Sequence, residues 1–309
     1  MLYLQNRLKC VHEYLVSLFE GIAQSIFRRD TWVREEGGGG ESCVFEGSKI
    51  FEGGGINFSS VYGRFLPSSA TVSRKHVEGQ QFFATGVSSV LHPWNPYAPT
   101  AHMNVRLFCA YPYGTTSPLD ENTCSFADGV TWWIGGGMDM TPYYGFMDDA
   151  RHFHSVCKNI LQPFGDLYPK FKENCDGYFF LKHRKEPRGI GGIFFDDFNC
   201  STLESSIGLL EAVGKGFFDA YAPIVERRHV LPYSDRERDF QLYRRGRYAE
   251  FNLLWDRGTA FGLQSGGRIE SILISMPPSV KWKYGYDILP SSPEEDLYTT
   301  FLKPRSWID

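Results

Sequence analysis

The 309-residue sequence has few of the features that mark nucleic-acid-binding, membrane or secreted proteins. Its 32 lysines and arginines stand against 36 aspartates and glutamates, and the net charge of −4 provides no broad basic surface for nucleic-acid phosphates. No stretch approaches the roughly 20 apolar residues that span a bilayer, so no transmembrane segment is expected. The first 30 residues lack a compact apolar core and a small-residue cleavage site. We therefore expect a cytoplasmic protein that does not bind nucleic acid.

Several motifs of cofactor and metal chemistry are also missing. The seven cysteines are scattered, without a CxxC pair or zinc-type Cys/His spacing, which indicates reduced thiols. The glycine runs 37–40 and 135–137 precede no Lys-Ser/Thr pair, so neither is a phosphate loop. Residues 189–192 miss the dinucleotide pattern because strand-like residues follow them. No HExxH motif is present.

What the sequence does contain is glycine and aromatic rings. It has 32 glycines, 25 phenylalanines, 17 tyrosines and 7 tryptophans, with 42% hydrophobic and 22% charged residues overall. This composition is that of a globular protein with a sizeable core. We expect many tight turns and a core or pocket walled with rings.

The N-terminal segment has the periodicity of a helix. Apolar residues recur every three or four positions and form one seam, which predicts a helix within residues 1–30 that docks on its own domain. The alternative is a free coiled coil, but the seam runs under four heptads. The seam consists of Leu4, Leu8, Val11, Leu15, Leu18, Ile22 and Ile26.

The rest of the chain alternates between strand-like and helical patterns. Helices are expected from 147 to about 174, from Leu203 with a Ser201/Glu204 capping box, and from Pro293 with Ser292 as its cap. Because runs of strands are followed by runs of helices, we predict an α+β fold with a large, mainly antiparallel sheet. No low-complexity linker divides the chain, so residues 1–309 are predicted to form a single domain. Strands are expected at 43–52, 56–63, 80–94, 101–112, 189–198 and 247–255.

One predicted strand carries a row of chemically useful side chains. His102, Asn104 and Arg106 lie on one face of it, because side chains alternate along a strand. An imidazole, an amide and a guanidinium can transfer a proton, donate hydrogen bonds and hold a carboxylate. The alternative is an ordinary solvated sheet face. A hairpin across the loop 93–100 would bring Ser88 and His92 towards the same surface.

Other candidate residues have simpler alternatives. Asp139 follows three glycines on a segment that we expect to be flexible, where an aspartate is most often a turn former. His183 is expected at a helix end, and Gly266-Gly267-Arg268 taken alone predicts a turn with a surface arginine. A metal site would have to be built from histidines that the sequence does not space as ligands. The histidines that could converge are His92, His102, His154 and His183.

Taken together, these segments resemble the oxygen-dependent coproporphyrinogen III oxidases over nearly the whole chain. Long strings occur in the family's order, which makes chance agreement negligible. The chain departs from the family at Gly53, where relatives often carry lysine, and in 113–129, which is similar to an insertion between two strands. The matching strings are GGGGESCVFEG, GVSSVLHPWNPYAPTAHMNVR, WWIGGGMDMTPYYGF, DGYFFLKHRKEPRGIGGIFFDDFN and RRGRYAEFNLLWDRGTAFGLQSGGRIESILISMPP.

The resemblance implies a reaction and roles for individual residues. The reaction is the oxidative decarboxylation of two propionates of coproporphyrinogen III to vinyl groups by O2, giving protoporphyrinogen IX in haem biosynthesis. His102 matches the position of the proton donor, and Asp139 matches an aspartate that engages the pyrrole nitrogens. The positions that match substrate contacts are Ser88, Asn104, Val105, Arg106, Gly266, Gly267 and Arg268.

The resemblance also implies an assembly and a cofactor requirement. Family members are homodimers whose sheet is flanked by helices, here on both faces, and the interface would lie at about 248–283. No metal or organic cofactor is required, although bacterial relatives are sometimes credited with a divalent metal on the four histidines named above. Two alternatives stay open from the residues: a His-ligated metal-dependent oxidase and a non-catalytic tetrapyrrole-binding protein.

Overall fold

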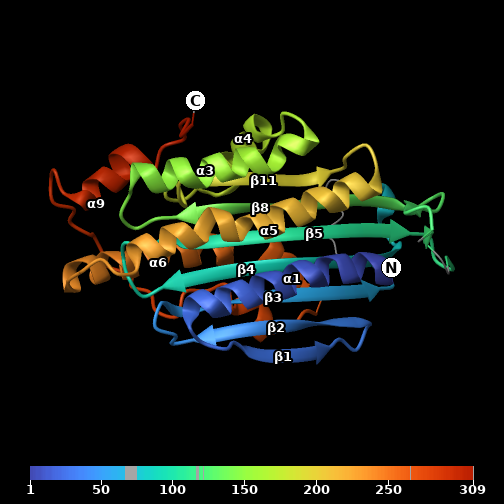
Figure 1. The fold of residues 1–309 in the computed structure, drawn as a ribbon. Coiled ribbons are helices and arrows are strands. Elements are labelled where there is room, and N and C mark those ends of the chain that lie inside the picture. Colours follow the sequence, from blue (N-terminus) through green and yellow to red (C-terminus); the bar gives the residue numbers. More distant parts are fainter. Residues whose placement is uncertain (67–74, 116–117, 121, 265, 309) are drawn as a thin grey trace.

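The computed structural model describes residues 1–66, 75–115, 118–120, 122–264 and 266–308. Its centre is a seven-stranded sheet in which all neighbouring strands are antiparallel (Figure 1). The strands lie in the order β1 (Arg28–Val33), β2 (Gly38–Glu46), β3 (Phe51–Gly63), β4 (Gln81–Pro93), β5 (Thr100–Tyr111), β8 (Thr131–Thr141) and β11 (Gly191–Phe198).

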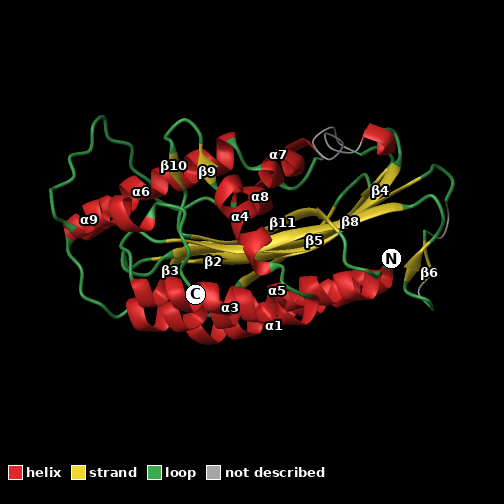
Figure 2. Cartoon of the chain, turned by 90° about the horizontal axis from the view of Figure 1, so that it is seen from above, coloured by secondary structure: helices red, strands yellow, loops and turns green. Residues whose placement is uncertain are grey.

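Helices cover both faces of this sheet, as predicted for the α+β class (Figure 2). One face is covered by α1 (Leu2–Ala23), α3 (Met147–Leu161) and α5 (Leu203–Arg228). On the other side lie α6 (Asp235–Leu254), α7 (Arg257–Gln264) and α8 (Ile269–Leu273). Helix α4 (Tyr168–Tyr178) packs on β11. The smaller elements are 3-10 turns at Lys75–Val77 and Gln162–Phe164, a hairpin of β9 (Phe180–Leu181) and β10 (Glu186–Pro187), α9 (Pro293–Asp296) and a π-helical turn at Leu297–Phe301.

The N-terminal helix docks on the sheet through its predicted apolar seam. The first four seam residues are at most 2% exposed. The seam then continues through Phe19 to Ala23, and not through Leu18 and Ile22. The helix ends at Ala23, because Gln24 adopts the left-handed conformation, and Ile26 lies beyond it, 87% exposed.

The hairpin of β4 and β5 confirms the predicted pairing at the middle of the sheet. Ser88 pairs with Asn104 and Val90 pairs with His102, so the polar row lies on a single face. Met103 and Val105, on the opposite face of β5, are fully buried. The apolar row thus belongs to the core under the helices, and the polar row is available to a ligand.

Two strand predictions need correction, and one further strand was not predicted. The range 43–52 is two strands, because residues 47–50 turn between β2 and β3. A further strand, β1, lies between the N-terminal helix and the glycine run at 37–40. The range 247–255 is wrong: it lies almost wholly in α6, which begins with a capping box made by Ser234 and Glu237. Buried arginines on α6 hid its helical apolar pattern.

Helix boundaries were also shifted in places. The predicted helix from 147 to 174 is divided into α3 and α4. Helix α5 is capped by Thr202, whose side chain accepts from Ser205 N, so the Ser201/Glu204 capping box is wrong. Ser292 caps α9 as predicted. His183 is not at a helix end but in the turn of the β9–β10 hairpin.

The segment 113–129 forms a small hairpin beside the main sheet. Its strands are β6 (Leu119–Asp120) and β7 (Ser125–Phe126), and Leu119 packs in the core. Residues 116, 117 and 121 of this segment lie outside the described residues.

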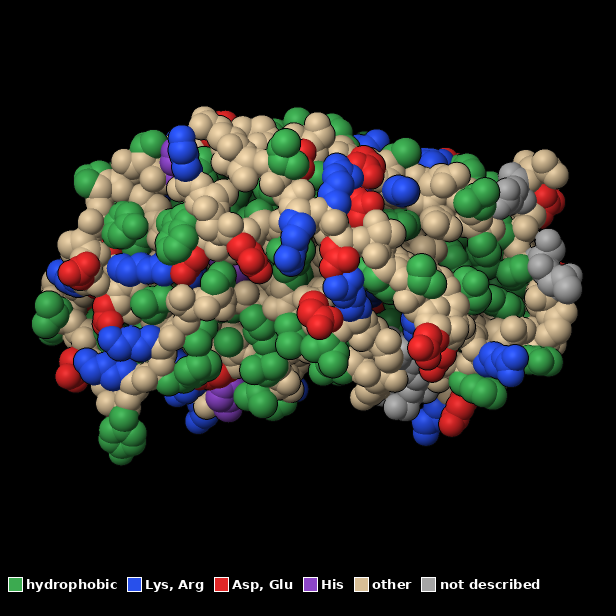
Figure 3. Space-filling view, turned by 90° about the horizontal axis from the view of Figure 1, so that it is seen from below, with side chains coloured by type: hydrophobic (Ala, Val, Ile, Leu, Met, Phe, Trp, Pro, Cys, Tyr) green, Lys and Arg blue, Asp and Glu red, His purple; other side chains and the backbone are tan. Residues whose placement is uncertain are grey.

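The outer surface mixes charges of both signs. In the view of Figure 3, basic and acidic side chains are interspersed over the face shown. Within the described ranges, no helix combines the length and the apolar character needed to cross a membrane.

Candidate active site

The polar row of β5 opens into a cavity between the sheet and the layer of α7 and α8. The cavity has a volume of about 270 Å³. Its walls carry the rings of Trp32, Tyr178, Phe179, Phe194 and Phe261, as the aromatic content predicted. A few polar groups among many rings are typical of small-molecule sites.

Four of the predicted site residues meet on the floor of this cavity. Ser88, His102, Asn104 and Arg106 all line it. They do so because β4 and β5 pair in a register that brings their same-phase side chains to one face. The structure thus places an imidazole, an amide, a hydroxyl and a guanidinium within one pocket.

Asp139 lies directly behind His102. The two residues are paired across β5 and β8, and His102 Nδ1 lies 2.8 Å from Asp139 Oδ1. Asp139 is 1% exposed and does not line the cavity. A carboxylate in this position accepts the Nδ1 proton, which leaves His102 Nε2 to face a ligand. No described residue makes a hydrogen bond to that Nε2.

The second partner of Asp139 is Arg188, which the sequence did not single out. Arg188 Nη2 donates to Asp139 Oδ1 at 2.9 Å and to Oδ2 at 2.7 Å, and Arg188 Nη1 donates to Asn252 at 3.0 Å. The Arg188 guanidinium is buried, with its Cζ 4.2 Å from the centre of the Phe179 ring and 4.5 Å from that of Tyr248.

These contacts set the charge of Asp139. Burial alone would raise its pKa, but the positive charge of Arg188 and the hydrogen bond from His102 outweigh burial and hold the pKa below its ordinary value. The site therefore contains a fixed negative charge behind the imidazole, within a layer of aromatic rings.

The triple glycine before Asp139 does not form the flexible bend that we expected. Residues 135–137 lie within β8, paired with β5 on one side and largely with β11 on the other. A Cβ at Gly135 would lie 2.7 Å from Asp196 Oδ1 and 2.9 Å from Arg106 Cζ. The absence of a side chain at this position makes room for the ion pair of Arg106 and Asp196 above the strand.

The two arginines that line the cavity, Arg106 and Arg268, are already paired with carboxylates, and Arg257 shares the partner of Arg106. Arg106 Nη2 lies 2.9 Å from Asp196 Oδ1, and Arg257 Nη2 lies 3.1 Å from Asp196 Oδ2. At the opposite end, Arg268 Nη2 lies 2.5 Å from Asp30 Oδ2. An anionic ligand can be held at two separated ends of this cavity, where it would compete with these carboxylates.

A further carboxylate, that of Asp256, lines the cavity directly. It accepts from Tyr178 OH at 2.9 Å and from Thr259 N at 2.8 Å. Burial raises its pKa, but these hydrogen bonds outweigh burial and lower it. Asp256 is thus an ionised group in contact with the ligand space, which Asp139 is not.

Two of the predicted contact residues are placed differently from the rest. Val105 is fully buried, and its side chain points to α5, where a Cβ on Gly214 would be 3.6 Å from Val105 Cγ2. Gly266 lies in the turn between α7 and α8 with a φ of 67° and does not line the cavity. Gly267 and Arg268 do line it.

The four candidate metal histidines do not gather in the structure. His92 lies 3.0 Å from both Thr100 Oγ1 and Ser275 O, and His154, on α3, lies between Tyr168 OH and Ile190 O. His183 contacts Glu250 and Trp255. Both ring nitrogens of these three histidines are therefore engaged by protein groups, and the set does not fit one ion.

The residues that sequence analysis missed share a physical reason. Arg188 follows β10, Asp196 lies within β11 and Asp256 lies between α6 and α7, and no local periodicity distinguishes them. From the sequence alone, a buried arginine such as Arg188 cannot be distinguished from an arginine on the surface, because its carboxylate partner is not known.

One comparison with known proteins bears on this site. The family model described as coproporphyrinogen III oxidase matches residues 4–307 of the chain. The match covers every element that forms the cavity and its buried ion pair.

Proposed function

The chain belongs to the coproporphyrinogen III oxidase family, which acts in porphyrin biosynthesis, and we propose that it converts two propionates of coproporphyrinogen III to vinyl groups with O2 as the oxidant. The product would be protoporphyrinogen IX. Each conversion of a propionate carboxylate to a vinyl group releases CO2, one proton and two electrons. In our proposal O2 accepts the electrons, and neither a metal nor an organic cofactor is required.

The observation that carries the proposal is the cavity floor of His102, Asn104 and Arg106 with Asp139 behind it. The substrate is a flexible ring of four pyrroles with four carboxylates. It requires cations for its carboxylates, acceptors for its pyrrole N–H groups and apolar walls for its rings. The cavity provides all three kinds of group.

We assign the proton transfer to His102. The Asp139 carboxylate orients the imidazole and stabilises its protonated form, so Nε2 can give or take a proton at the substrate. Removal of a pyrrole proton makes the ring electron-rich enough to react with O2. The resulting peroxide then takes a hydrogen from the propionate β-carbon as CO2 leaves.

The pyrrole N–H groups need an acceptor that reaches the ligand. Asp139 was predicted for this contact from the resemblance, but its two oxygens are taken by Arg188 and His102. Asp256 lines the cavity and is ionised, so we propose that Asp256 accepts from the pyrroles while Asp139 acts through His102. Fixed charge of this kind works best where water is excluded.

The propionates are assigned to the two ends of the cavity. Arg106 and Arg268 can each form a bidentate pair with a carboxylate, which explains how a net acidic protein can bind a tetra-anion. We propose that α7 and α8 move away from the sheet when the substrate enters. The Arg268–Asp30 pair and the 2.7 Å contact of Ser42 Oγ with Ser271 Oγ would break in that movement.

We propose a cytoplasmic homodimer formed through 248–283. This range carries apolar side chains that are half exposed or more, including Leu254 at 61%, Ile269 at 57% and Trp282 at 56%. All seven cysteines are free, which supports a reducing compartment. Light scattering during gel filtration should give twice the 35.3 kDa chain mass.

The test of function is an incubation of metal-stripped protein with coproporphyrinogen III, with and without O2. We expect CO2 and vinyl products only in the aerobic sample. Loss of activity on stripping that metal restores, with the circular dichroism spectrum unchanged by stripping, would favour the His-ligated oxidase. Binding without CO2 release would favour a tetrapyrrole carrier.

A further inference from the structure

A buried histidine interrupts the apolar seam of α1, on the face of the sheet opposite the cavity. His12 has no exposed surface and packs against β3, with its Nε2 3.2 Å from Ile56 O. Its Nδ1 is buried and has no hydrogen-bond partner within the described ranges. A buried polar atom without a partner costs about 1–3 kcal/mol, so a histidine here needs a reason.

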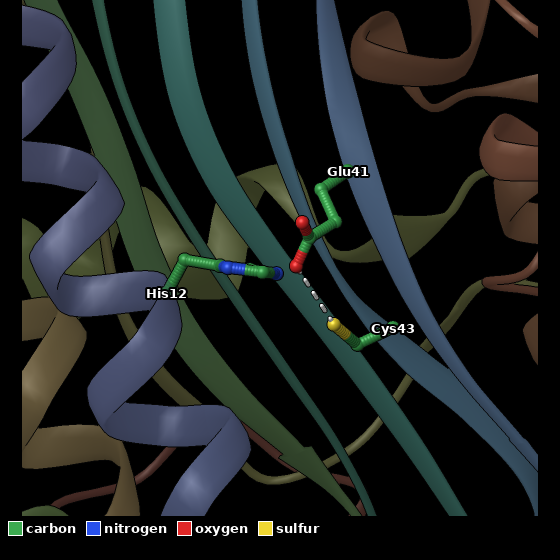
Figure 4. Close-up of side chains that lie close together, drawn as sticks. All are labelled: His12, Glu41 and Cys43. Carbon is green, nitrogen blue, oxygen red and sulfur yellow. Dashed lines mark hydrogen bonds between the residues drawn. The ribbon is translucent and has the colours of Figure 1, made fainter. Parts of the chain in front are cut away.

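Two possible metal ligands face this imidazole from β2. Glu41 and Cys43 are two residues apart, so their side chains lie on the same face of the strand. One ligand atom from each of the three residues lies within 4.8 Å of the others. Figure 4 shows the imidazole, the carboxylate and the thiol pointing towards one another from α1 and β2.

The spacing of the two β2 ligands suits a tetrahedral ion. Cys43 Sγ lies 3.5 Å from Glu41 Oε1. Metal–ligand lengths of about 2.3 Å to sulfur and about 2.0 Å to oxygen give a tetrahedral edge of roughly 3.5 Å. The sulfur and the carboxylate can therefore bind one ion with little movement.

We propose that His12, Glu41 and Cys43 bind a divalent transition-metal ion with the preferences of Zn²⁺, with water in the fourth position. Imidazole, thiolate and carboxylate are the ligands that Zn²⁺ takes in proteins. The Cys43 thiol loses its proton to solvent as the sulfur–metal bond forms. The two anionic ligands then balance the charge of the ion, which clamps α1 onto β2.

Burial favours the neutral forms of two of these side chains, since it lowers the pKa of His12 and raises the pKa of Cys43 to about 12. Glu13 on α1 and Glu41 and Arg29 on the β1–β2 hairpin are the charged groups that face His12.

Arg29 is the competitor for Glu41. Its Nη1 lies 2.9 Å from Glu41 Oε1 and 3.0 Å from Glu13 Oε2. The Arg29 side chain is 42% exposed, so it can stay with Glu13 when a metal takes Glu41. Glu41 also lines a second cavity of about 570 Å³ beside Gln5 and Lys9 at the start of α1.

The test is a titration of metal-stripped full-length protein with Co²⁺, followed by Zn²⁺. We expect one equivalent of Co²⁺ per chain with a thiolate-to-cobalt charge-transfer band, and displacement of the cobalt by Zn²⁺. Cys43→Ser should abolish the band and His12→Leu should weaken binding at least tenfold. Cys109→Ser is the matched control, because this thiol is equally buried and its pKa is also raised to about 12.

Two further variants keep the proposal falsifiable if Cys43→Ser does not fold. Arg29→Gln removes the competitor without touching a ligand and should tighten Co²⁺ binding several-fold. Cys10→Ser removes the exposed thiol on α1 and should leave the band unchanged. The proposal is overturned if no thiolate band forms, if the band survives in Cys43→Ser, or if Arg29→Gln binds no more tightly than the wild type.

Discussion

Replacing Asp139 by asparagine separates the two things that this carboxylate does. The side chain keeps its shape but loses its charge, so Arg188 becomes an unpaired cation in the protein interior. Both side chains are only 2% exposed, and no discount for solvent screening applies. Breaking a buried pair of this kind costs about 3–5 kcal/mol of unfolding free energy.

The same change should slow the reaction. The amide can no longer hold His102 in one tautomer or stabilise its protonated form. General acid–base catalysis contributes about 10²–10⁴-fold to a rate, so we expect aerobic turnover of coproporphyrinogen III to fall by at least about 100-fold. The assays are urea unfolding followed by circular dichroism, and vinyl product formation at a temperature at which the variant is folded.

A matched control comes from the other side of the sheet. Asp149 is 3% exposed and its carboxylate pairs with Arg227 and Arg228, which are 44% and 17% exposed. Asp149→Asn should lose less stability and keep kcat/KM within about twofold of the wild type. If Asp139→Asn turned over as fast as Asp149→Asn, the role of Asp139 behind His102 would be refuted.

Three further predictions concern stability and binding. Burial lowers the pKa of His92 and the pKa of His154 from 6.5 to about 3. Between these values only the unfolded chain takes up the two protons. The unfolding free energy should therefore fall by roughly 1.4 kcal/mol per histidine for each pH unit that the pH is lowered below 6.5. His154→Phe should flatten that slope in urea unfolding between pH 6 and about 4 by this amount, and an unchanged slope would contradict the assignment. Arg106→Lys should raise KM for coproporphyrinogen III about tenfold or more with a smaller change in kcat, because lysine cannot form a bidentate pair with a carboxylate. An unchanged KM in steady-state kinetics would contradict this role of Arg106. Thr202→Ala should lower the unfolding free energy by about 1 kcal/mol, whereas Ser201→Ala should leave it unchanged. A larger loss of stability in Ser201→Ala than in Thr202→Ala would show that Ser201 is the cap.

The part of the fold that could be predicted from sequence is the part with a clear local period. The alternation in β4 and β5 predicted both strands, their pairing and the polar face. In α6 the pattern misled, because the buried residues include Arg244, Arg245 and Arg247, which a search for apolar periodicity passes over. The α5 cap was missed by one residue because Ser201 and Thr202 are both good capping residues.

The site divides in the same way. His102, Asn104 and Arg106 share one strand, so their common face follows from the geometry of a strand. Asp139 lies beside His102 because of the register between β5 and β8, and Arg188 reaches Asp139 from a turn after β10. No local sequence pattern indicates this register or this turn. Asp256 enters the cavity only because α6 ends beside Tyr178.

The most direct test of the account is simultaneous measurement of O2 uptake and CO2 release by metal-free protein given coproporphyrinogen III. We predict that the wild type consumes O2 in a fixed ratio to the CO2 it releases. In His102→Gln both O2 uptake and CO2 release should fall to about a hundredth of the wild-type rate or less. Release of CO2 without O2 uptake, or a His102→Gln rate near that of the wild type, would contradict it.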